Sequence, residues 1–479
     1  MSKKKLKNDG IFFCGNNADD VTGSQILIKH NGKQILLECG LYQSSKNSFL
    51  DAYRVNSAKF KFNANEIDYV FICHPHIDHI GLIPRLFKEG FEGKIILTKP
   101  TLIIAESLLN NCAFILNEEA RILTKRFKRD YEPIYNKYDV NAILDYMYTY
   151  DDYNKIIKLD ENVSFQWLPN SHCLGATQLQ LILGENGTSK KILYTSDIGE
   201  LKTKNNFMTN TEIPQMFSDY TIMESTYGNK LSKRKTRGFD KDNLKTAIET
   251  TINRNGTFIL PAFSFNRSQE LLGVLYDLFH KDKNFKTPII VDSKLTCEIC
   301  DLYDSILEKN NKRLWRKILN WDKINFIRTK EDSQICIADK RPKIIISSSG
   351  FCTNGRVVGY LEKYLQDRNS MICFSGYTGA NTNFLSYKIK HSDEHKTINI
   401  NKKPIKNYAD VITLGSFSSH AGFKDLIKYG SNLNTNKLIL VHGSKEAKEN
   451  LQKELKKEIS KNNKSYKVNS CNKEMIINF

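Results

Sequence analysis

The segment Ile67–Gly81 reads IDYVFICHPHIDHIG and decides the fold, because it joins a buried strand directly to a dense group of polar side chains. Its first half is β-branched and aromatic, which predicts a strand. Of the ten histidines in the chain, His74, His76 and His79 stand here, around Asp78. Stacked core histidines are the structural alternative, but three imidazoles beside a carboxylate are costly to bury without a metal. Because imidazole and carboxylate suit Zn²⁺ and related metals, the segment predicts a metal site at a strand end.

Two later motifs fit the same chemistry. His172 lies in NSHCLGA (170–176), in a loop between two predicted strands, and Asp197 lies in YTSDIG (194–199), just past a strand end. Alone, a loop histidine is more often a surface residue, and SDxG is often a turn. Because they follow the first cluster in this order, we interpret both residues as metal ligands. A carboxylate such as Asp197 can bridge two cations.

Length and charge limit the classes of protein. A chain of 479 residues suggests two or three domains. Lys and Arg number 71 against 53 Asp and Glu, a net charge of +18. A basic surface attracts polyanions by releasing counterions, although abundant lysine also keeps a protein soluble. Charge alone is therefore compatible with two interpretations, a nucleic-acid partner and a surface that only keeps the protein soluble.

The sequence predicts a soluble, cytoplasmic protein without membrane association. No apolar run approaches the ~18 residues that a membrane helix needs. The basic start, MSKKKLKNDGIFFCG, lacks the apolar stretch of an export signal. The eleven cysteines are interpreted as reduced thiols. Cys297 and Cys300, in CEIC, have metal-site spacing, but no second pair appears, and packing is the favoured explanation.

The pattern of predicted elements changes along the chain. Early strands flank Asn31-Gly32, a strong hairpin signal, and residues 105–150 show helical spacing. From about residue 231, strands alternate with helices, as in the strands Lys343–Ser347 and Met371–Phe374, which indicates a parallel α/β domain. A charged helix is predicted at Lys445–Lys461.

Taken together, these motifs resemble the metallo-β-lactamase superfamily and, within it, the β-CASP nucleases of RNA processing. The Gly23-Ser24 strand pair, HPHIDH, SHCLGA and YTSDIG match the superfamily in order. Three further motifs match the β-CASP family, namely Glu224 in MESTYG, His420 in FSSHA and His442 in VHG.

The resemblance implies an α/β architecture, a four-layered αββα metallo-β-lactamase sandwich with an inserted β-CASP α/β domain. Residues 1–230 and 405–479 would form the discontinuous metallo-β-lactamase domain, and residues 231–404 the β-CASP domain. The active site would lie in the cleft between them.

The same resemblance assigns roles to residues. His74, His76 and His172 would hold one Zn²⁺, Asp78, His79 and His442 a second, and Asp197 would bridge both. Two such cations make a hydroxide available at neutral pH and neutralise a phosphodiester. Asp78, Glu224 and His420 form the predicted catalytic set. His420 is the candidate general acid, with Glu224 orienting it and raising its pKa.

Other positions are expected to support the ligands or bind phosphate. Glu38 stands where the family usually has Asp, a residue that orients a metal-binding histidine, and its extra methylene could alter metal preference. Ser348, Ser349, Gly350, Ser375 and Gly376 follow predicted strands, where backbone N–H groups can approach an anion, with an ordinary turn as the alternative. Arg267 resembles a β-CASP arginine that faces the substrate strand, and Arg356, at the start of a predicted helix, is a second candidate.

The leading hypothesis is a zinc-dependent ribonuclease. Its expected partner is RNA, single-stranded by preference, and a homodimer is one candidate assembly. RNA is favoured over DNA because His442 resembles the histidine of the RNA-acting branches. The alternatives are a DNA-acting β-CASP nuclease, an inactive subunit that binds RNA or a partner, and a small-molecule hydrolase, which would not explain the inserted domain.

Overall fold

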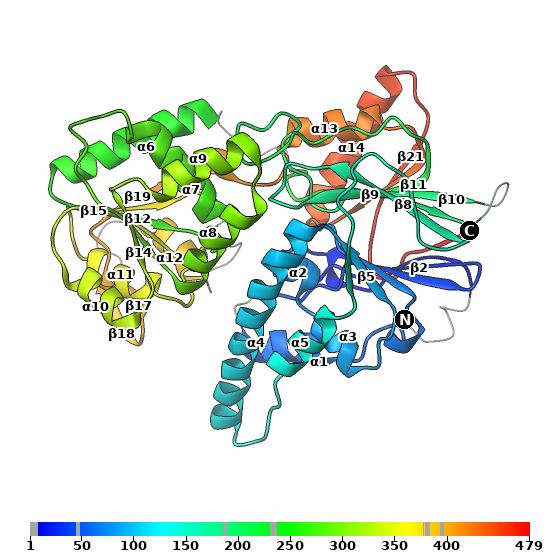
Figure 1. Cartoon of the computed structure of the whole chain (residues 1–479), viewed down its shortest axis with the longest axis horizontal. Helices are drawn as coiled ribbons and strands as arrows, with labels where there is room; N and C mark the ends of the chain where they lie inside the picture. The colour runs from blue at the N-terminus through cyan, green and yellow to red at the C-terminus, as the bar shows by residue number, and fades with distance from the viewer. Residues whose placement is uncertain are drawn as a thin grey trace.

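The computed structural model describes residues 8–44, 48–184, 189–229, 237–376, 378, 384–392 and 397–479. Within this part of the chain lie two seven-stranded sheets, a six-stranded sheet and a two-stranded hairpin. The seven-stranded sheets pack together on one side of the molecule and the six-stranded sheet lies on the other side (Figure 1).

The first sheet has the order β22-β1-β2-β3-β4-β5-β6. The β2–β3 hairpin turns at Asn31 and Gly32, whose φ angles of 49° and 77° fit a type I′ turn, so the predicted hairpin is present. The strands of this sheet are β1 (Gly10–Phe13), β2 (Ile26–His30), β3 (Lys33–Leu37), β4 (Tyr69–Phe71), β5 (Lys94–Leu97), β6 (Met147–Thr149) and β22 (Ile476–Asn478).

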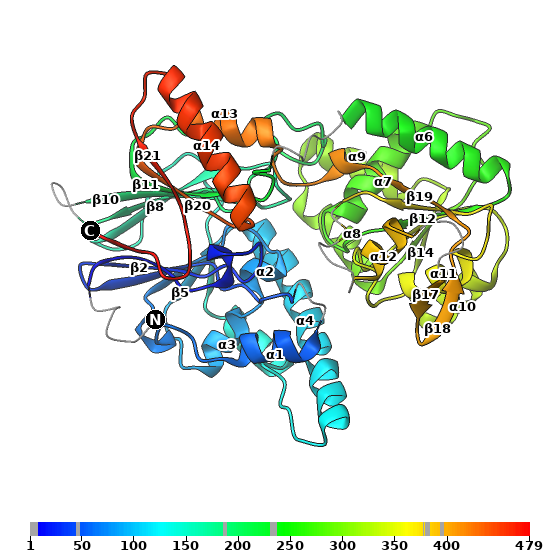
Figure 2. The ribbon, with the colours of Figure 1, turned by 180° about the vertical axis from the view of Figure 1, so that it is seen from behind.

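The second sheet has the order β21-β20-β11-β10-β9-β8-β7, and its neighbours β10, β11 and β20 run parallel. Its strands are β7 (Ile157–Lys158), β8 (Val163–Pro169), β9 (Thr177–Leu183), β10 (Lys190–Tyr194), β11 (Ser218–Glu224), β20 (Thr435–Val441) and β21 (Lys467–Ser470). Because β1 pairs with β22, the last strand of the chain lies beside the first strands of this half (Figure 2).

Helices cover the outer faces of these two sheets. The first sheet carries α1 (Phe49–Ser57), α2 (Ile77–Ile80), α3 (Ile83–Lys88), α4 (Lys99–Phe127) and α5 (Lys137–Leu144), and the second carries α13 (Phe423–Asn432) and α14 (Lys445–Lys461). Between the sheets, Phe71 packs against Phe165 and Trp167 in a separate core. Three apolar layers thus separate four structural layers, which confirms the predicted αββα sandwich.

The third sheet is parallel throughout and has the order β14-β13-β15-β12-β16-β19. Its strands are β12 (Thr257–Pro261), β13 (Ile289–Asp292), β14 (Ile324–Ile327), β15 (Lys343–Ser347), β16 (Met371–Phe374) and β19 (Asp410–Thr413), and the hairpin is β17 (Thr397–Ile400) with β18 (Lys403–Lys406). Its helices are α6 (Arg237–Asn253), α7 (Arg267–Phe279), α8 (Lys294–Ile306), α9 (Lys309–Leu319), α10 (Lys330–Ala338), α11 (Val357–Tyr364) and α12 (Leu385–Lys390).

Both faces of this sheet are buried, as in doubly covered parallel sheets. Phe258 and Leu260 of β12 face one apolar cluster and Ile259 faces another. The first cluster also includes Ile104 and Leu108 of α4, so the two halves of the molecule share a core.

The predicted return to the first domain at residue 405 falls before β19, which pairs with β16 in the third sheet. We therefore propose that the chain leaves the inserted domain after β19, near Leu414. None of the described helices combines the length and the apolar character that crossing a bilayer requires.

Candidate metal centre and active site

The site lies where several strands end. Asp197, Glu224 and His442 stand at or just past the carboxyl ends of β10, β11 and β20, which are parallel neighbours and so finish at the same edge of the sheet. His172 lies in the loop that joins β8 to β9. His74 follows β4 of the facing sheet, and the open edge of the sandwich collects all of these loops.

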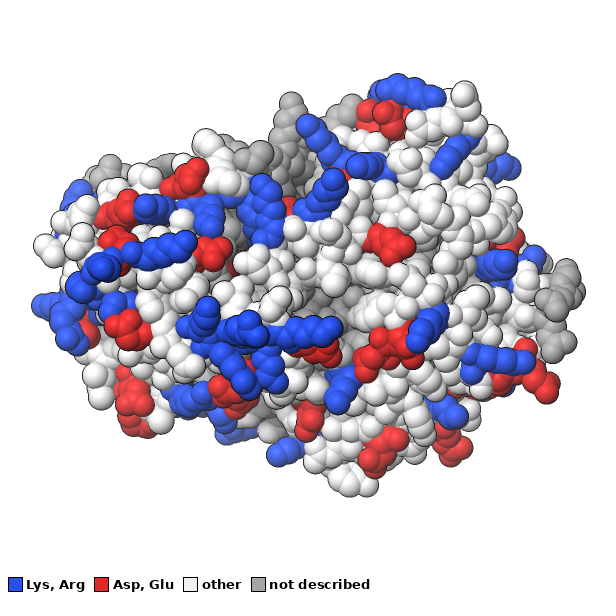
Figure 3. All heavy atoms as spheres, turned by 45° about the horizontal axis from the view of Figure 1, so that its top comes forward, with Lys and Arg blue, Asp and Glu red and all other residues white. Residues whose placement is uncertain are grey.

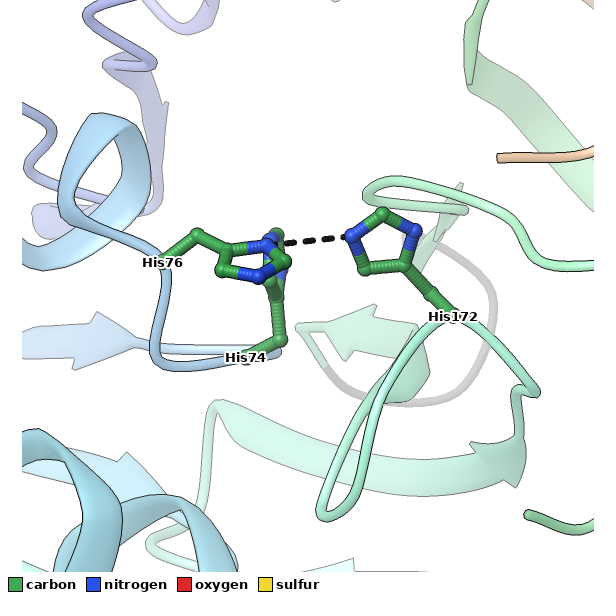
Figure 4. A group of neighbouring side chains, drawn as sticks. All are labelled: His74, His76 and His172. Atoms are coloured by element: carbon green, nitrogen blue, oxygen red, sulfur yellow. Dashed lines mark hydrogen bonds between the residues drawn. The ribbon is translucent and has the colours of Figure 1, made fainter. Parts of the chain in front are cut away.

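The first predicted ligand set comes together. Nε2 of His172 lies 3.1 Å from Nδ1 of His76 (dashed line, Figure 4). The ring of His74 lies 4.9 Å from each of those two rings, measured between centroids. One atom of each side chain can reach a common point. Burial and the neighbouring imidazoles lower the pKa of His74 and His172, which favours the neutral, metal-binding form.

The second predicted set gathers beside the first. Nε2 of His79 lies 3.4 Å from Oδ2 of Asp197, and Nδ1 of His442 lies 3.3 Å from the other Asp197 oxygen. Oδ2 of Asp78 lies 3.8 Å from His79 Nε2 and 3.7 Å from His442 Nε2. Asp197 therefore lies between the two sets, as a bridging carboxylate would.

These residues fit zinc on two observations. First, several of their buried atoms have no hydrogen-bond partner among the described residues, namely His74 Nε2, His442 Nε2 and Asp197 Oδ1, and such atoms are costly to bury unless they bind something. Second, zinc–nitrogen bonds of about 2.0–2.1 Å at a tetrahedral angle separate two ligand nitrogens by about 3.3 Å. The 3.1 Å between His76 and His172 is close to that separation.

The carboxylate–histidine pair that the sequence predicts, Glu224 and His420, adjoins these residues. Nδ1 of His420 lies 3.0 Å from Oε1 of Glu224, and Nε2 of His420 lies 3.9 Å from Asp197. Glu224 is held in turn, since the backbone N–H of Ile198 donates to Oε1 and that of Thr226 to Oε2. Burial lowers the pKa of His420, but the charges of Glu224 and Asp197 outweigh it and raise that pKa to about 9.

Glu38 lies behind the ligands, fully buried. Its Oε1 is 3.5 Å from His79 Nδ1 and accepts hydrogen bonds from Ser196 Oγ (3.1 Å) and the Cys73 N–H (3.2 Å). Ser196 Oγ also lies 3.2 Å from His74 Nδ1. The Glu38 carboxylate therefore lies beside His79 directly and is linked to His74 through Ser196.

Sequence reasoning missed several residues that position the ligands. Asn170 accepts from the N–H groups of His172 and Gly199 and donates to the Asp197 carbonyl, tying two ligand loops together. Thr226 Oγ1 contacts His442 Nδ1 at 3.0 Å. The available signal was adjacency, because Asn170, Ser196 and Thr226 all lie within two residues of a motif residue.

The predicted phosphate-binding residues are engaged elsewhere. Arg356 donates to Asp292 (2.7 Å) and to two backbone carbonyls, which fixes the start of α11 inside the third-sheet half. Arg267 donates to Glu270 and to Ser419 beside His420. These contacts give both arginines a structural partner, and their role in phosphate binding stays a prediction.

The predicted phosphate-binding serines after β15 also have hydrogen-bond partners of their own. Ser348 Oγ donates to Ser293 (2.8 Å), and Ser349 Oγ donates to the Asn354 carbonyl (3.3 Å). A Cβ at Gly350 would lie 3.0 Å from the ring of Phe263, so a larger residue there requires a small shift of that exposed ring. Ser375 is buried, whereas a Cβ at Gly376 would meet open space.

The CEIC pair belongs to the core. Cys297 and Cys300 lie in the large apolar cluster of the third-sheet half, as packing predicts. The Cys297 thiol contacts backbone carbonyls, and Gln269 contacts Cys300.

Family models match most of the chain. Residues 15–232 match the model "Anti-Pycsar protein Apyc1", residues 268–383 match "Beta-Casp domain", and residues 404–466 match "Zn-dependent metallo-hydrolase RNA specificity domain". The second match covers much of the third-sheet half, and the third covers the segment with His420 and His442.

Relatives that match most of the length of this chain have names consistent with the family models. A ribonuclease of Thermus thermophilus is 25% identical over 90% of this chain and 92% of its own length. The RNase J-like protein of Methanocaldococcus jannaschii is 28% identical over 80% of this chain and 83% of its own. The cleavage and polyadenylation specificity factor 73 of Drosophila melanogaster is 26% identical over 92% of this chain, but the match spans only 60% of that protein.

A solved structure supports the fold alone. A protein of unknown function from Enterococcus faecalis superimposes with a TM-score of 0.56 over 98% of this chain and 100% of its own, at 14% identity. With the matched domains in the predicted order, the chain belongs to the metallo-β-lactamase β-CASP family of RNA nucleases.

Proposed function

We propose that this protein is a zinc-dependent ribonuclease that hydrolyses phosphodiester bonds in the cleft beside the third-sheet half. The observation that carries the proposal is the close approach of two metal-ligand sets to a carboxylate–histidine pair: His420 Nε2 lies 3.9 Å from Asp197. The chain also matches 92% of the length of a relative named as a ribonuclease.

The two ligand sets would hold one zinc ion each, with Asp197 between them. Bound there, the ions would lower the pKa of a water molecule and offset the charge of the phosphate. Glu38, through His79 and Ser196, holds ligand rings in place. The Asp78 carboxylate lies near both His79 and His442 and would bind the same ion as these two rings.

His420 would give a proton to the leaving oxygen. Its Nδ1 is turned toward Glu224, so Nε2 faces the side on which Asp197 lies. Glu224 stabilises the protonated ring, and its own position is fixed by two backbone N–H groups. The pair therefore keeps an acid ready at neutral pH.

The test uses matched RNA and DNA oligonucleotides with and without a chelator. We expect RNA cleavage that the chelator abolishes and added Zn²⁺ restores. Cleavage of DNA alone would overturn the RNA assignment. Zinc content discriminates the inactive-subunit alternative: two ions per chain support the enzyme, whereas fewer than one after careful purification supports the alternative.

Finer points of the proposal are a single-stranded substrate, a homodimer and a cytoplasmic location. The eleven free cysteines are compatible with a reducing compartment. Sedimentation of the purified chain tests the homodimer, and a monomer at working concentration would exclude it.

A further inference from the structure

One face of α9 carries only positive charge. The helix reads KNNKRLWRKIL and contains no acidic residue. Its cations recur at helical spacing, so they share a face, while Trp315 and Ile318 are buried on the opposite side. Arg316 pairs with Asp304, and no other α9 cation has an ion pair among the described residues. The cations are Lys309, Lys312, Arg313, Arg316 and Lys317.

Beside this face lies a hollow of about 840 Å³. The α9 cations form one wall, and three aromatic rings, from Tyr276, His280 and Trp321, line another part. The rings of Tyr276 and His280 stack, with centroids 4.2 Å apart and planes at 8°. Trp321 meets Tyr276 edge-on at 5.5 Å. Cations and half-exposed rings thus face one space.

We propose that the hollow and the α9 face form a second binding site for single-stranded RNA, outside the metal centre; this rests on the proposed ribonuclease function. Phosphates would bind the cations, and bases would stack on the rings, the combination that single-stranded nucleic acid uses. An acidic protein segment would bind the cations but would leave the aromatic rings unused. RNA accounts for both features of the hollow.

Helix α7 connects the hollow to the metal centre. At its start, Asn266 donates to the His172 carbonyl. At its other end, Tyr276 and His280 line the hollow. A helix of 13 residues, at 1.5 Å per residue, is about 20 Å long. The two sites are therefore about one length of α7 apart, a distance that one RNA strand can bridge, with the hollow holding the strand while the metal centre cuts it.

The distribution of charge supports this path. Figure 3 shows Lys and Arg side chains gathered in a band toward the half that holds the third sheet. With a net charge of +18, long-range attraction favours a polyanion in general. The hollow gives that attraction a specific place, because cations and rings converge there.

The decisive variant removes charge from the hollow and leaves the metal centre intact. In K312Q/R313Q/K317Q, Arg316 stays to keep its pair with Asp304. We expect the KM for an RNA of about 20 nucleotides to rise at least tenfold, with kcat and zinc content unchanged. An RNA of about three nucleotides is too short to span both sites, even when it is extended, and should be cut as before.

The matched control removes as many exposed charges from the α13–α14 surface, in K428Q/K453Q/K456Q, and should change neither KM. The salt dependence of binding adds a second measure: losing three cations should reduce the slope of log K against log salt by about 2 for a single strand. An unchanged KM for the long RNA in the α9 variant would overturn the proposal.

Tryptophan fluorescence reports the hollow directly. Trp167 and Trp315 are fully buried, whereas Trp321 lines the hollow. In the H420A background, in which cleavage should be at least about a hundredfold slower, the long RNA should quench this emission, and H280A should weaken the binding. Equal quenching by poly-glutamate would overturn the RNA assignment and favour an acidic protein partner. Binding and quenching by a wild-type chain that cuts no RNA would refute the ribonuclease function but keep this site.

Discussion

At the scale of single residues, Asp197 is the centre of the site. Its carboxylate oxygens lie between 3.3 and 3.9 Å from ring nitrogens of five histidines, namely His74, His79, His172, His420 and His442. A negative charge at the centre stabilises such a cluster, because a positive charge on one imidazole disfavours protonation of its neighbours. Removing that charge should therefore affect metal binding first.

The variants D197N and H420A should fail in different ways. D197N should lose zinc and activity together, because an amide is a poor bridging ligand. H420A should keep its zinc and lose about a hundredfold or more in kcat, since proton transfer is worth about 10²–10⁴. Metal analysis and single-turnover cleavage measure the two effects. Native rates in H420A would refute its role as the acid.

The Glu224–His420 pair predicts a pH effect. The acid must be protonated, so activity falls as pH rises through the pKa of His420, which Glu224 and Asp197 raise to about 9. E224Q removes one negative charge and lowers this pKa, so the alkaline limb of the rate profile should move about one to two pH units downward. Bound cations would move the alkaline limb to lower pH in both the wild type and E224Q. The limb of E224Q would still lie at the lower pH of the two. A limb that stays in place would exclude Glu224 as the partner.

At the scale of elements, the sequence predicted the strands and helices whose ends bear chemistry better than the segments between them. β15, β16 and α14 match their expected bounds because each is a short apolar or strongly periodic run. The helices α8 to α10 were not predicted. The signal was present in α9, because its cations recur on one face and its buried residues Trp315 and Ile318 lie on the other.

The same limit explains the phosphate-binding candidates. Arg356 stands at a helix start, as the sequence indicates, but its partner Asp292 is far away in the chain and belongs to another strand. A pattern of neighbours cannot show such a contact. The proposed metal ligands could be predicted to cluster because four of them are close in sequence: His74, His76, Asp78 and His79 fall within six residues.

Helix α4 provides a test of stability. Burial raises the pKa of Glu119 from 4.5 to about 7. The unfolded chain ionises at the lower value, so the folded state loses stability as pH rises from about 4.5 to 7, and the cost persists above 7. E119Q should raise the free energy of unfolding by about 2 kcal/mol at pH 8 and little at pH 4. Urea unfolding at both pH values measures this.

The control for that test is Glu118, the neighbouring residue. Its carboxylate is exposed and pairs with Arg121, so E118Q should give no gain at either pH. A gain in E119Q that is equal at pH 4 and pH 8 would show that packing, not charge burial, is responsible.

At the scale of the whole molecule, His420 depends on both halves. It lies in the segment that returns from the third sheet after β19. On one side, Glu224 holds its ring and the Ala421 N–H donates to the Ile198 carbonyl. On the other side, its neighbour Ser419 is held by the start of α7. The acid is therefore positioned only when the two halves are docked.

Ser419 tests this dependence. Its Oγ accepts from Asn266 Nδ2 at 2.8 Å and from Arg267 at 3.3 Å. S419A removes both contacts, so the loop should hold His420 less firmly and kcat should fall about tenfold, which corresponds to about 1.4 kcal/mol. KM and zinc content should not change, because among the described residues the Ser419 side chain bonds to Asn266 and Arg267 and not to a proposed ligand. A lower zinc content would instead show that the loop supports the metal centre, and an unchanged kcat would show that Glu224 alone positions the acid.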